Sequence, residues 1–209
     1  MPFCPSKNFI FTHITKTAGS SFNKVFTTTF GAHDYLLTGH VNHEINYFVG
    51  FKNYQDLEHL TVQQQSKILG PKRFNDCFKF TFVRNPWDRL VSNYFWKQND
   101  PWANKKVKEY VNTHSFEQYI LEGIAPLAVP MHQWVTDSNK KVVVDFVGRY
   151  ENLHDDFSKV CQKINIKTPE LPQVYKTNHK PYKDYYSQAT IDKVASVYKD
   201  DIEIFGYDY

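Results

Sequence analysis

The spacing of hydrophobic residues changes repeatedly along the chain, and these changes predict alternating strands and helices. Phe78, Phe80 and Phe82 alternate with polar residues, as expected for a half-buried strand over 78–84. The apolar residues that follow are spaced as on one face of a helix, which predicts a helix over 86–98. The same criteria predict strands at 8–13, 35–38 and 142–148 and helices at 19–30, 61–69, 104–111, 115–122, 152–164 and 187–204.

This order of elements predicts the fold class. Strands that alternate with helices are typical of an α/β fold with a central parallel sheet and helices on both faces. A chain of 209 residues can bury one core but is short for two, and no linker or repeat interrupts it, so we predict a single domain over 1–209. The polar segment 39–60 is poorly periodic and reads either as an acceptor site or as a surface loop.

A loop of small and hydroxyl residues lies between the first predicted strand and helix. Lys16 offers a mobile positive charge, and Thr17, Ser20 and Ser21 offer donors beside a helix N-terminus, where unpaired N–H groups favour an anion. The loop therefore predicts a site for a phosphate or sulfate ester. Lys16 precedes Gly19, whereas the nucleoside-triphosphate loop has its lysine after the glycines. A generic strand-to-helix turn is the alternative.

A second segment combines a buried strand with a capped helix. Asn85 is a good N-cap, and Pro86 suits the first helical position. Arg84 falls at the carboxyl end of the strand, where ligands of open α/β sheets bind, and its guanidinium fork suits phosphate oxygens. Ser92, two turns into the helix, is placed to reach the same anion. Alternatively, Arg84 pairs with Asp88 and Ser92 only packs against the sheet.

Composition narrows the function classes. The net charge is +3, from 25 basic and 22 acidic residues, which excludes a polycation that coats nucleic acid and requires any cationic site to be local. Aromatic residues make up 17% of the chain. They predict a phenylalanine-rich core, a cleft that stacks on an adenine or a sugar, or both.

The cysteines and the apolar runs of the sequence indicate in which cellular compartment the protein is expected. No run resembles a signal peptide or a membrane span. Cys4, Cys77 and Cys161 have neither metal nor redox spacing, and their odd number suits free thiols. We predict a cytoplasmic protein without a metal site, a membrane partner or a nucleic-acid partner. A Golgi-type domain without its anchor would look similar.

Together the two anion-binding segments resemble a known family. Residues 13–21 read His-Ile-Thr-Lys-Thr-Ala-Gly-Ser-Ser, and residues 80–94 read Phe-Thr-Phe-Val-Arg-Asn-Pro-Trp-Asp-Arg-Leu-Val-Ser-Asn-Tyr. This pair is similar to that of the sulfotransferases that use PAPS (3′-phosphoadenosine 5′-phosphosulfate), and closest to the heparan-sulfate 2-O and chondroitin carbohydrate branch with its small bacterial relatives. The resemblance, which spans nearly the whole chain, implies a P-loop-like fold.

The resemblance also implies roles for individual residues. The first loop would hold the 5′-phosphosulfate of PAPS, and Arg84 with Ser92 would hold its 3′-phosphate. A C-terminal flap with Lys180 and Tyr182 would close over the nucleotide, although a solvated turn is an equal alternative. The residues of the first loop are Lys16, Thr17, Ala18, Gly19, Ser20 and Ser21. The chain departs from the family at Thr15, where proline is common, and at Ala18, where glycine is common.

The chemistry expected from the resemblance is sulfuryl transfer from PAPS to an acceptor hydroxyl group, with PAP as the product and no metal. Lys16 would stabilise the leaving group. A histidine is the best base near neutral pH. His59 is the first candidate, because it matches the family's His-x-Thr element before a helix, and His40 in Gly-His-Val is the second. His13, at the end of the first strand, is expected to orient the loop.

Two other functions remain open at this point. A P-loop-like nucleotide kinase would need its lysine after the glycines and an acidic magnesium ligand at a strand end. A non-catalytic nucleotide-binding module would keep the anion sites without a base. The acceptor is expected to be a small molecule or a glycan, and the sequence specifies neither its identity nor the oligomeric state.

Overall fold

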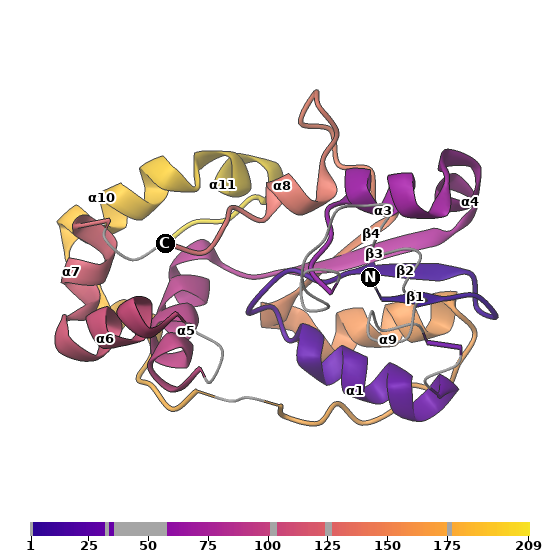
Figure 1. Ribbon diagram of the computed structural model, residues 1–209, viewed down its shortest axis with the longest axis horizontal. Helices are drawn as coiled ribbons and strands as arrows, with labels where there is room; N and C mark the ends of the chain where they lie inside the picture. The colour runs from indigo at the N-terminus through magenta and orange to yellow at the C-terminus, as the bar shows by residue number, and fades with distance from the viewer. Residues whose placement is uncertain (1, 32–33, 36–57, 101–103, 124–126, 175–176) are drawn as a thin grey trace. The chain divides into compact units, whose positions relative to one another are not determined.

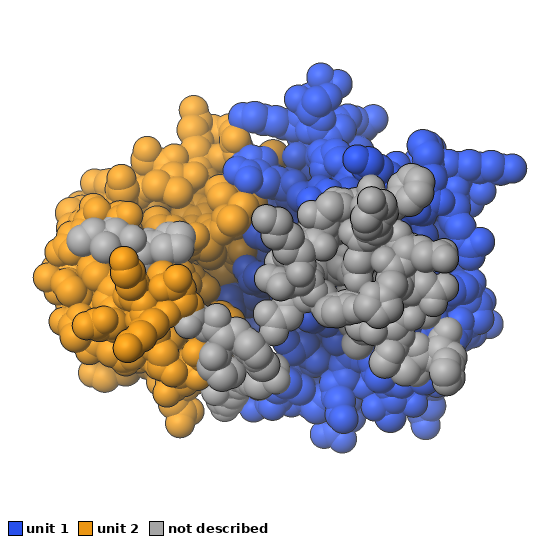
Figure 2. Space-filling model, in the orientation of Figure 1, with its two compact units in different colours: residues 1–83, 131–174 blue, residues 84–130, 175–209 orange. Residues whose placement is uncertain are grey.

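The computed structural model describes residues 2–31, 34–35, 58–100, 104–123, 127–174 and 177–209 (Figure 1). The chain divides into two compact units, coloured separately in Figure 2. Unit 1 contains residues 1–83 and 131–174, and unit 2 contains residues 84–130 and 175–209. The chain therefore passes from one unit to the other three times. That residues 1–209 form a single domain stays a prediction.

Unit 1 contains a four-stranded sheet in the order β1-β2-β3-β4. Its strands are β1 (Phe3–Cys4), β2 (Phe9–Thr12), β3 (Phe78–Val83) and β4 (Phe146–Arg149). The β2–β3 and β3–β4 pairs are parallel, and only the short edge strand β1 is antiparallel. The predicted α/β class is confirmed. Strand β1 was not predicted, because two residues are too few to show a pattern.

Helices cover both faces of this sheet (Figure 1). On one face lie α1 (Gly19–Phe30) and α9 (Leu153–Lys163); on the other lie α3 (Val62–Leu69) and α4 (Pro71–Asp76). The α1 and α9 face buries a phenylalanine-rich cluster that includes Phe9, Phe11, Phe22, Phe26, Phe80, Phe82 and Phe157. The opposite face buries a smaller cluster that includes Ile10, Leu60, Val62 and Phe74.

The phenylalanine cluster accounts for much of the aromatic content. Phe11 and Phe80 occupy facing positions of the β2–β3 pair, and their rings stack with centroids 5.1 Å apart. Phe82 faces Gly148 on β4, where a Cβ atom would lie 2.5 Å from the Phe82 ring. Glycine at this position therefore lets a large ring lie flat against the neighbouring strand. Of the two explanations for the high aromatic content, unit 1 shows the phenylalanine-rich core.

Unit 2 is helical in the residues that the structure describes. It contains α5 (Pro86–Asn99), α6 (Lys105–Thr113), α7 (Phe116–Leu121), α10 (Gln188–Val197) and α11 (Lys199–Phe205). The predicted start of α5 is correct: the Asn85 side chain accepts hydrogen bonds from the N–H groups of Trp87 and Asp88. The single helix predicted at 187–204 is two helices. They divide at buried Tyr198, whose hydroxyl donates to the Ala128 carbonyl.

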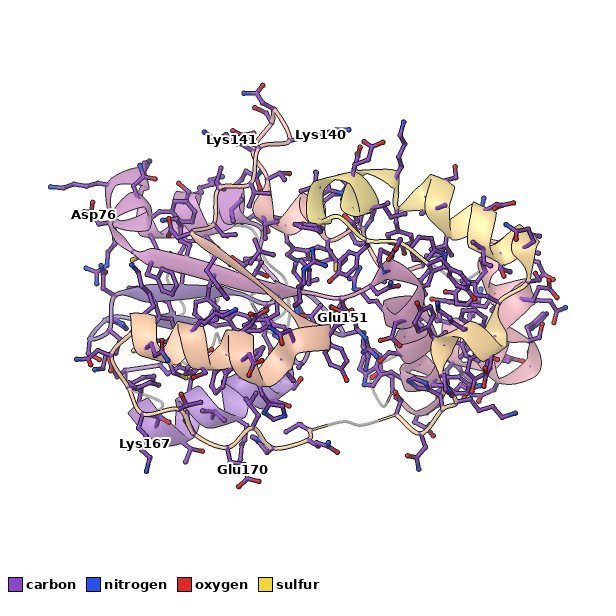
Figure 3. All side chains as sticks on the ribbon, turned by 180° about the vertical axis from the view of Figure 1, so that it is seen from behind. Asp76, Lys140, Lys141, Glu151, Lys167 and Glu170 are labelled. Atoms are coloured by element: carbon purple, nitrogen blue, oxygen red, sulfur yellow. The ribbon has the colours of Figure 1, made fainter. Side chains whose placement is uncertain are left out.

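The segment before β4 also differs from the prediction. Val142 forms only an isolated bridge with Thr136, and the strand begins at Phe146. Residues 136–142 make a tight loop, and Figure 3 shows Lys140 and Lys141 at its tip. The short helix α8 (His132–Val135) and the 3₁₀ helices Tyr150–Asn152 and Tyr182–Tyr185 were not predicted. Of the predicted strand 35–38 only Tyr35 is described, in a bend, and residues 36–38 and nearly all of segment 39–60 lie outside the described residues.

Candidate functional site

The loop between β2 and α1 is wound tightly by its own backbone. Lys16 and Ala18 have left-handed backbone angles, with φ of 66° and 68°. The Ala18 carbonyl accepts a hydrogen bond from the N–H of Ser21 at 2.9 Å. The Thr17 hydroxyl, which is buried, donates to the Ile14 carbonyl at 2.9 Å. These bonds bring the chain sharply into α1, which begins at Gly19 as predicted.

The start of α1 has the electrostatics of an anion site. No acidic residue lies in the first turn of this helix, so nothing on the helix itself offsets the positive end of its dipole. Lys16 and Ser20 are half-buried beside it, whereas the Ser21 hydroxyl accepts from the Val174 N–H at 3.4 Å. Thr17 and Ser21 therefore shape the loop through their side chains. Lys16, Ser20 and the backbone N–H groups are the better candidates for contact with an anion.

The buried His13 ring packs directly against Gly19. A Cβ atom on Gly19 would lie 1.9 Å from both Cδ2 and Nε2 of His13. Only glycine therefore leaves room for this ring at the start of the helix. His13 therefore joins the end of β2 to the loop, and its role in orienting the loop stays a prediction.

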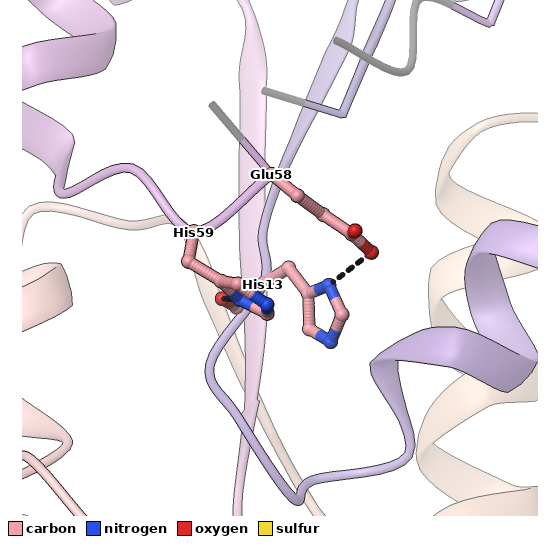
Figure 4. Close-up of side chains that lie close together, drawn as sticks. All are labelled: His13, Glu58 and His59. Atoms are coloured by element: carbon pink, nitrogen blue, oxygen red, sulfur yellow. Dashed lines mark hydrogen bonds and ion pairs between the residues drawn. The ribbon is translucent and has the colours of Figure 1, made fainter. Parts of the chain in front are cut away.

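His13 also contacts His59, the predicted base (Figure 4). Their ring centroids are 4.4 Å apart, and the His59 Nδ1–H donates to the His13 backbone carbonyl at 2.9 Å. The Nδ1 of His13 lies 2.9 Å from Oε1 of Glu58, which as a carboxylate can only accept. Both rings thus use Nδ1 as a donor, so Nε2 is the nitrogen that would act as a base in each.

The environment keeps His59 neutral at physiological pH. Burial, together with repulsion from His13, lowers the pKa of His59 from 6.5 to about 4. Burial acts to raise the pKa of Glu58, but the hydrogen bond from His13 and the charges of both histidines outweigh it and lower this pKa to about 2. Glu58 is therefore a carboxylate, and His59 has an unprotonated Nε2.

Glu58 was not found from the sequence, where it carries no motif. The Asn23 side-chain amide donates to Oε1 of Glu58 at 2.5 Å, and the Tyr35 hydroxyl donates to the Asn23 amide oxygen at 2.8 Å. One potential metal-ligand atom from each of His13, Glu58 and His59 (a ring nitrogen or a carboxylate oxygen) lies within 4.8 Å of the other two, a spacing that could hold a metal ion. The hydrogen bonds within the group already account for this arrangement.

The second predicted anion site belongs to unit 2. Arg84 directly follows β3 in the sequence and is buried, as is Ser92 on α5. The Arg84 Nε–H donates to the Asp88 carboxylate at 2.7 Å, so the alternative pairing considered for Arg84 is present. This ion pair orients the guanidinium, and anion binding by Arg84 stays a prediction.

The remaining predicted residues have different outcomes. Tyr182 packs edge-on against Tyr209, with centroids 5.7 Å apart, and is half-buried. Lys180 is exposed, and its backbone N–H donates to the Tyr185 hydroxyl at 3.0 Å. The segment around them is thus folded onto an aromatic cluster of unit 2. His40 lies outside the described residues.

Within the described ranges, none of the helices has the length and apolar character needed to cross a membrane. This finding concerns the helices alone.

Comparisons with known proteins address the family. The model of the sulfotransferase family matches residues 1–208, which include both predicted anion-binding segments and the His13, Glu58 and His59 group. An uncharacterised protein of Archaeoglobus fulgidus is 36% identical over 105 residues, which cover 47% of this chain and 76% of that protein. No solved structure matches the chain. Because the family match extends over almost every residue, the chain belongs to the sulfotransferase family.

Proposed function

We propose that this protein transfers a sulfuryl group from PAPS to an acceptor hydroxyl group, with a carbohydrate as the acceptor class that the resemblance favours. The observation that carries the proposal is the contact between His59 and His13, whose own ring packs against Gly19. It supports the proposal because it brings the candidate base close to the loop that the resemblance assigns to the 5′-phosphosulfate.

The nucleotide contacts follow from the resemblance and from local chemistry. We assign Lys16 and the backbone N–H groups of residues 18–20 to the 5′-phosphosulfate, because the Ser21 N–H already donates to the Ala18 carbonyl. The lack of acidic residues in the first turn of α1 supports this assignment. Arg84 and Ser92 are assigned to the 3′-phosphate, and Lys180 and Tyr182 to the nucleotide. Transfer requires the sulfur to lie in line between the bridging phosphate oxygen and the acceptor, and contacts to the phosphosulfate favour that position.

The transfer itself needs a base and a stabilised leaving group. The acceptor oxygen forms a bond to sulfur while the bond from sulfur to the bridging oxygen breaks, and PAP leaves. His59 Nε2 takes the acceptor proton, because it is unprotonated at neutral pH and Nδ1 is already a donor to the His13 carbonyl. Lys16 offsets the negative charge that develops on the bridging oxygen. No step calls for a metal ion.

Family membership weighs against the kinase alternative, since it favours sulfuryl rather than phosphoryl transfer. A nucleotide-binding module without catalysis would have the same two anion sites. Wild-type turnover of labelled PAPS, lost in His59→Ala, would separate that module from an enzyme.

Calorimetric titration with PAP, compared with ATP and ADP in the presence of magnesium, tests the nucleotide assignment. We expect micromolar PAP binding that Arg84→Ala abolishes, because the 3′-phosphate loses its guanidinium partner. The exposed Arg73 on α4 provides a matched control, and Arg73→Ala should bind PAP as the wild type does. Preference for ATP with magnesium would overturn the proposal. PAP binding would justify an acceptor screen with labelled PAPS.

A further inference from the structure

Glu58 accepts two hydrogen bonds at one carboxylate oxygen, although the proposed transfer gives it no role. Oε1 lies 2.9 Å from His13 Nδ1 and 2.5 Å from Asn23 Nδ2. Its two partners come from the end of β2 and from α1, while Glu58 itself precedes α3. One carboxylate therefore joins three segments of unit 1 beside the anion-binding loop.

The core supports this carboxylate. Asn23 is 6% exposed, and its amide oxygen accepts from the hydroxyl of Tyr35, which is fully buried. Burial and the negative charge of Glu58 raise the pKa of Tyr35, so its hydroxyl keeps the proton that it donates. Hydrogen bonds thus lead from Tyr35 through Asn23 to Glu58, and they fix the position of the carboxylate independently of its contact with His13.

The fixed Glu58 carboxylate determines the orientation and the tautomer of the His13 ring. Because Glu58 can only accept, His13 must present Nδ1–H to it, and Nε2 then faces the Cα of Gly19. The opposite tautomer would leave Nδ1 and Oε1, two acceptors, 2.9 Å apart, and the 3.4 Å contact from the Asn23 amide to Nδ1 is too long to offset this repulsion. Glu58 thus selects both the tautomer and the orientation of the ring next to the loop.

The same interaction holds the segment that carries His59. Glu58 and His59 are adjacent, and each makes a hydrogen bond to His13, one to its ring and one to its backbone carbonyl. Two bonds from neighbouring residues to one residue restrict rotation of the segment about either bond. Loss of the Glu58 carboxylate would leave the base attached to β2 by its own hydrogen bond alone.

We propose that Glu58 is a positioning residue of the sulfuryl-transfer site, which holds the His13 ring against Gly19 and the His59 segment against the end of β2. The inference rests on the proposed function for its catalytic consequence, but not for its geometry. Glu58 is a poor base in its own right, because a carboxylate that accepts two hydrogen bonds has little affinity for the acceptor proton.

The geometry is tested without any substrate by long-range ¹H–¹⁵N spectra of the histidine rings. In the wild type, His13 should carry a proton on Nδ1, and Glu58→Ala should produce a mixture of tautomers at His13. The exposed Glu170 of the same unit gives a matched control, and Glu170→Ala should leave the His13 signals unchanged. A wild-type His13 protonated only on Nε2, or one insensitive to Glu58→Ala, would overturn the proposal.

The catalytic consequence is tested by separating turnover from binding. Glu58→Ala should lower kcat for PAPS about 100-fold, the lower end for loss of a positioned acid–base group, with PAP affinity within about twofold of the wild type. Glu58→Gln should lower kcat less, because its amide oxygen can still accept from His13. This isosteric variant also keeps the test informative if Glu58→Ala does not fold.

The outcomes of the two experiments are distinguishable. Wild-type kcat in Glu58→Ala would overturn the positioning role. The role would also be overturned if Glu58→Gln and Glu58→Ala lost kcat equally and if each loss of kcat matched the loss of thermal stability of that variant. If the wild type does not bind PAP, the proposed function fails, while the ring spectra still decide whether Glu58 positions His13.

Discussion

The Nδ1–H of His59 donates a hydrogen bond to the backbone carbonyl of His13, with 2.9 Å between nitrogen and oxygen. Because the acceptor is a backbone atom, this bond would survive replacement of the His13 side chain. The His59 carbonyl in turn accepts from the Trp134 indole N–H at 3.3 Å. The backbone and the ring of His59 are therefore held separately, and a substitution at this position removes the ring without removing the indole contact.

The base assignment predicts a selective loss of transfer. We expect His59→Ala to lower turnover at least about 100-fold, because the acceptor proton loses its receptor, while PAP binding stays close to that of the wild type. Labelled PAPS measures the first quantity and calorimetry the second. His154 is exposed on α9, so His154→Ala is a suitable control that should retain activity. Near-wild-type turnover in His59→Ala would make His40 the leading candidate.

The pH dependence of kcat/KM should reflect the low pKa of His59. Burial and repulsion from His13 lower this pKa to about 4, so His59 is largely unprotonated above about pH 5. We expect kcat/KM to stay level on the acid side down to about pH 5 and to fall as the pH approaches the pKa of the base. An acid limb centred near the ordinary histidine value would show that the His59 ring is solvated in the working enzyme.

Stability should decrease as the pH is lowered through two windows. The folded-state pKa of His59 is lowered from 6.5 to about 4, so between these values the unfolded chain binds its proton first and unfolding becomes easier. The pKa of Glu58 is lowered from 4.5 to about 2, so stability should also decrease as the pH falls through this more acidic window. Urea midpoints measured across this range should fall less steeply in His59→Ala above pH 4 and in Glu58→Gln below it.

Gly19→Ala should disturb the loop through His13. The new Cβ atom would lie 1.9 Å from the His13 ring, which Glu58 prevents from moving aside. We expect a loss of about 1–3 kcal/mol in the free energy of unfolding, typical of overpacking, together with weaker PAP binding. Urea denaturation and calorimetry measure the two effects.

The neighbouring residue supplies a control with the opposite sign. Ala18 has a φ of 68°, a conformation that costs a non-glycine residue about 1–2 kcal/mol. Ala18→Gly should remove this cost but add about 0.4–1 kcal/mol of unfolded-chain entropy, so the net change in stability should be neutral or slightly stabilising.

A double variant tests whether the His13 ring is the obstacle to Gly19→Ala. If it is, Gly19→Ala should lower the free energy of unfolding less in a Glu58→Ala background, where the ring can move. Equal losses in both backgrounds would contradict this explanation.

Local rules predicted much of the fold because its elements begin with strong signals. Thr61 forms a capping box with Gln64, and Asn85 caps α5, so both helices start where the sequence indicates. The errors came from places where tertiary contacts decide. An apolar run at Val142 looks like a strand, yet the chain first turns back on Thr136. Tyr198 has helical spacing, but its bond to Ala128 accompanies a break between two helices.

The candidate site was predictable only in part for a similar reason. Lys16 and Gly19 could be found because the loop chemistry lies within a few consecutive residues. Glu58 could not, since it meets His13 across 45 positions and Asn23 across 35, and no local pattern encodes such meetings. The position of His59 beside His13 followed from the same long-range contacts, although the sequence had indicated the residue itself.

The alternation of the chain between its two units has a consequence for synthesis on the ribosome. The sheet of unit 1 receives β4 only after residues 84–130 of unit 2 have emerged, and unit 2 receives α10 and α11 only from the final segment. Domains generally fold as units once their residues are available. Neither unit can therefore complete its fold before residues far downstream have emerged, and the buried faces of α5 and α7 must wait for residues 188–205.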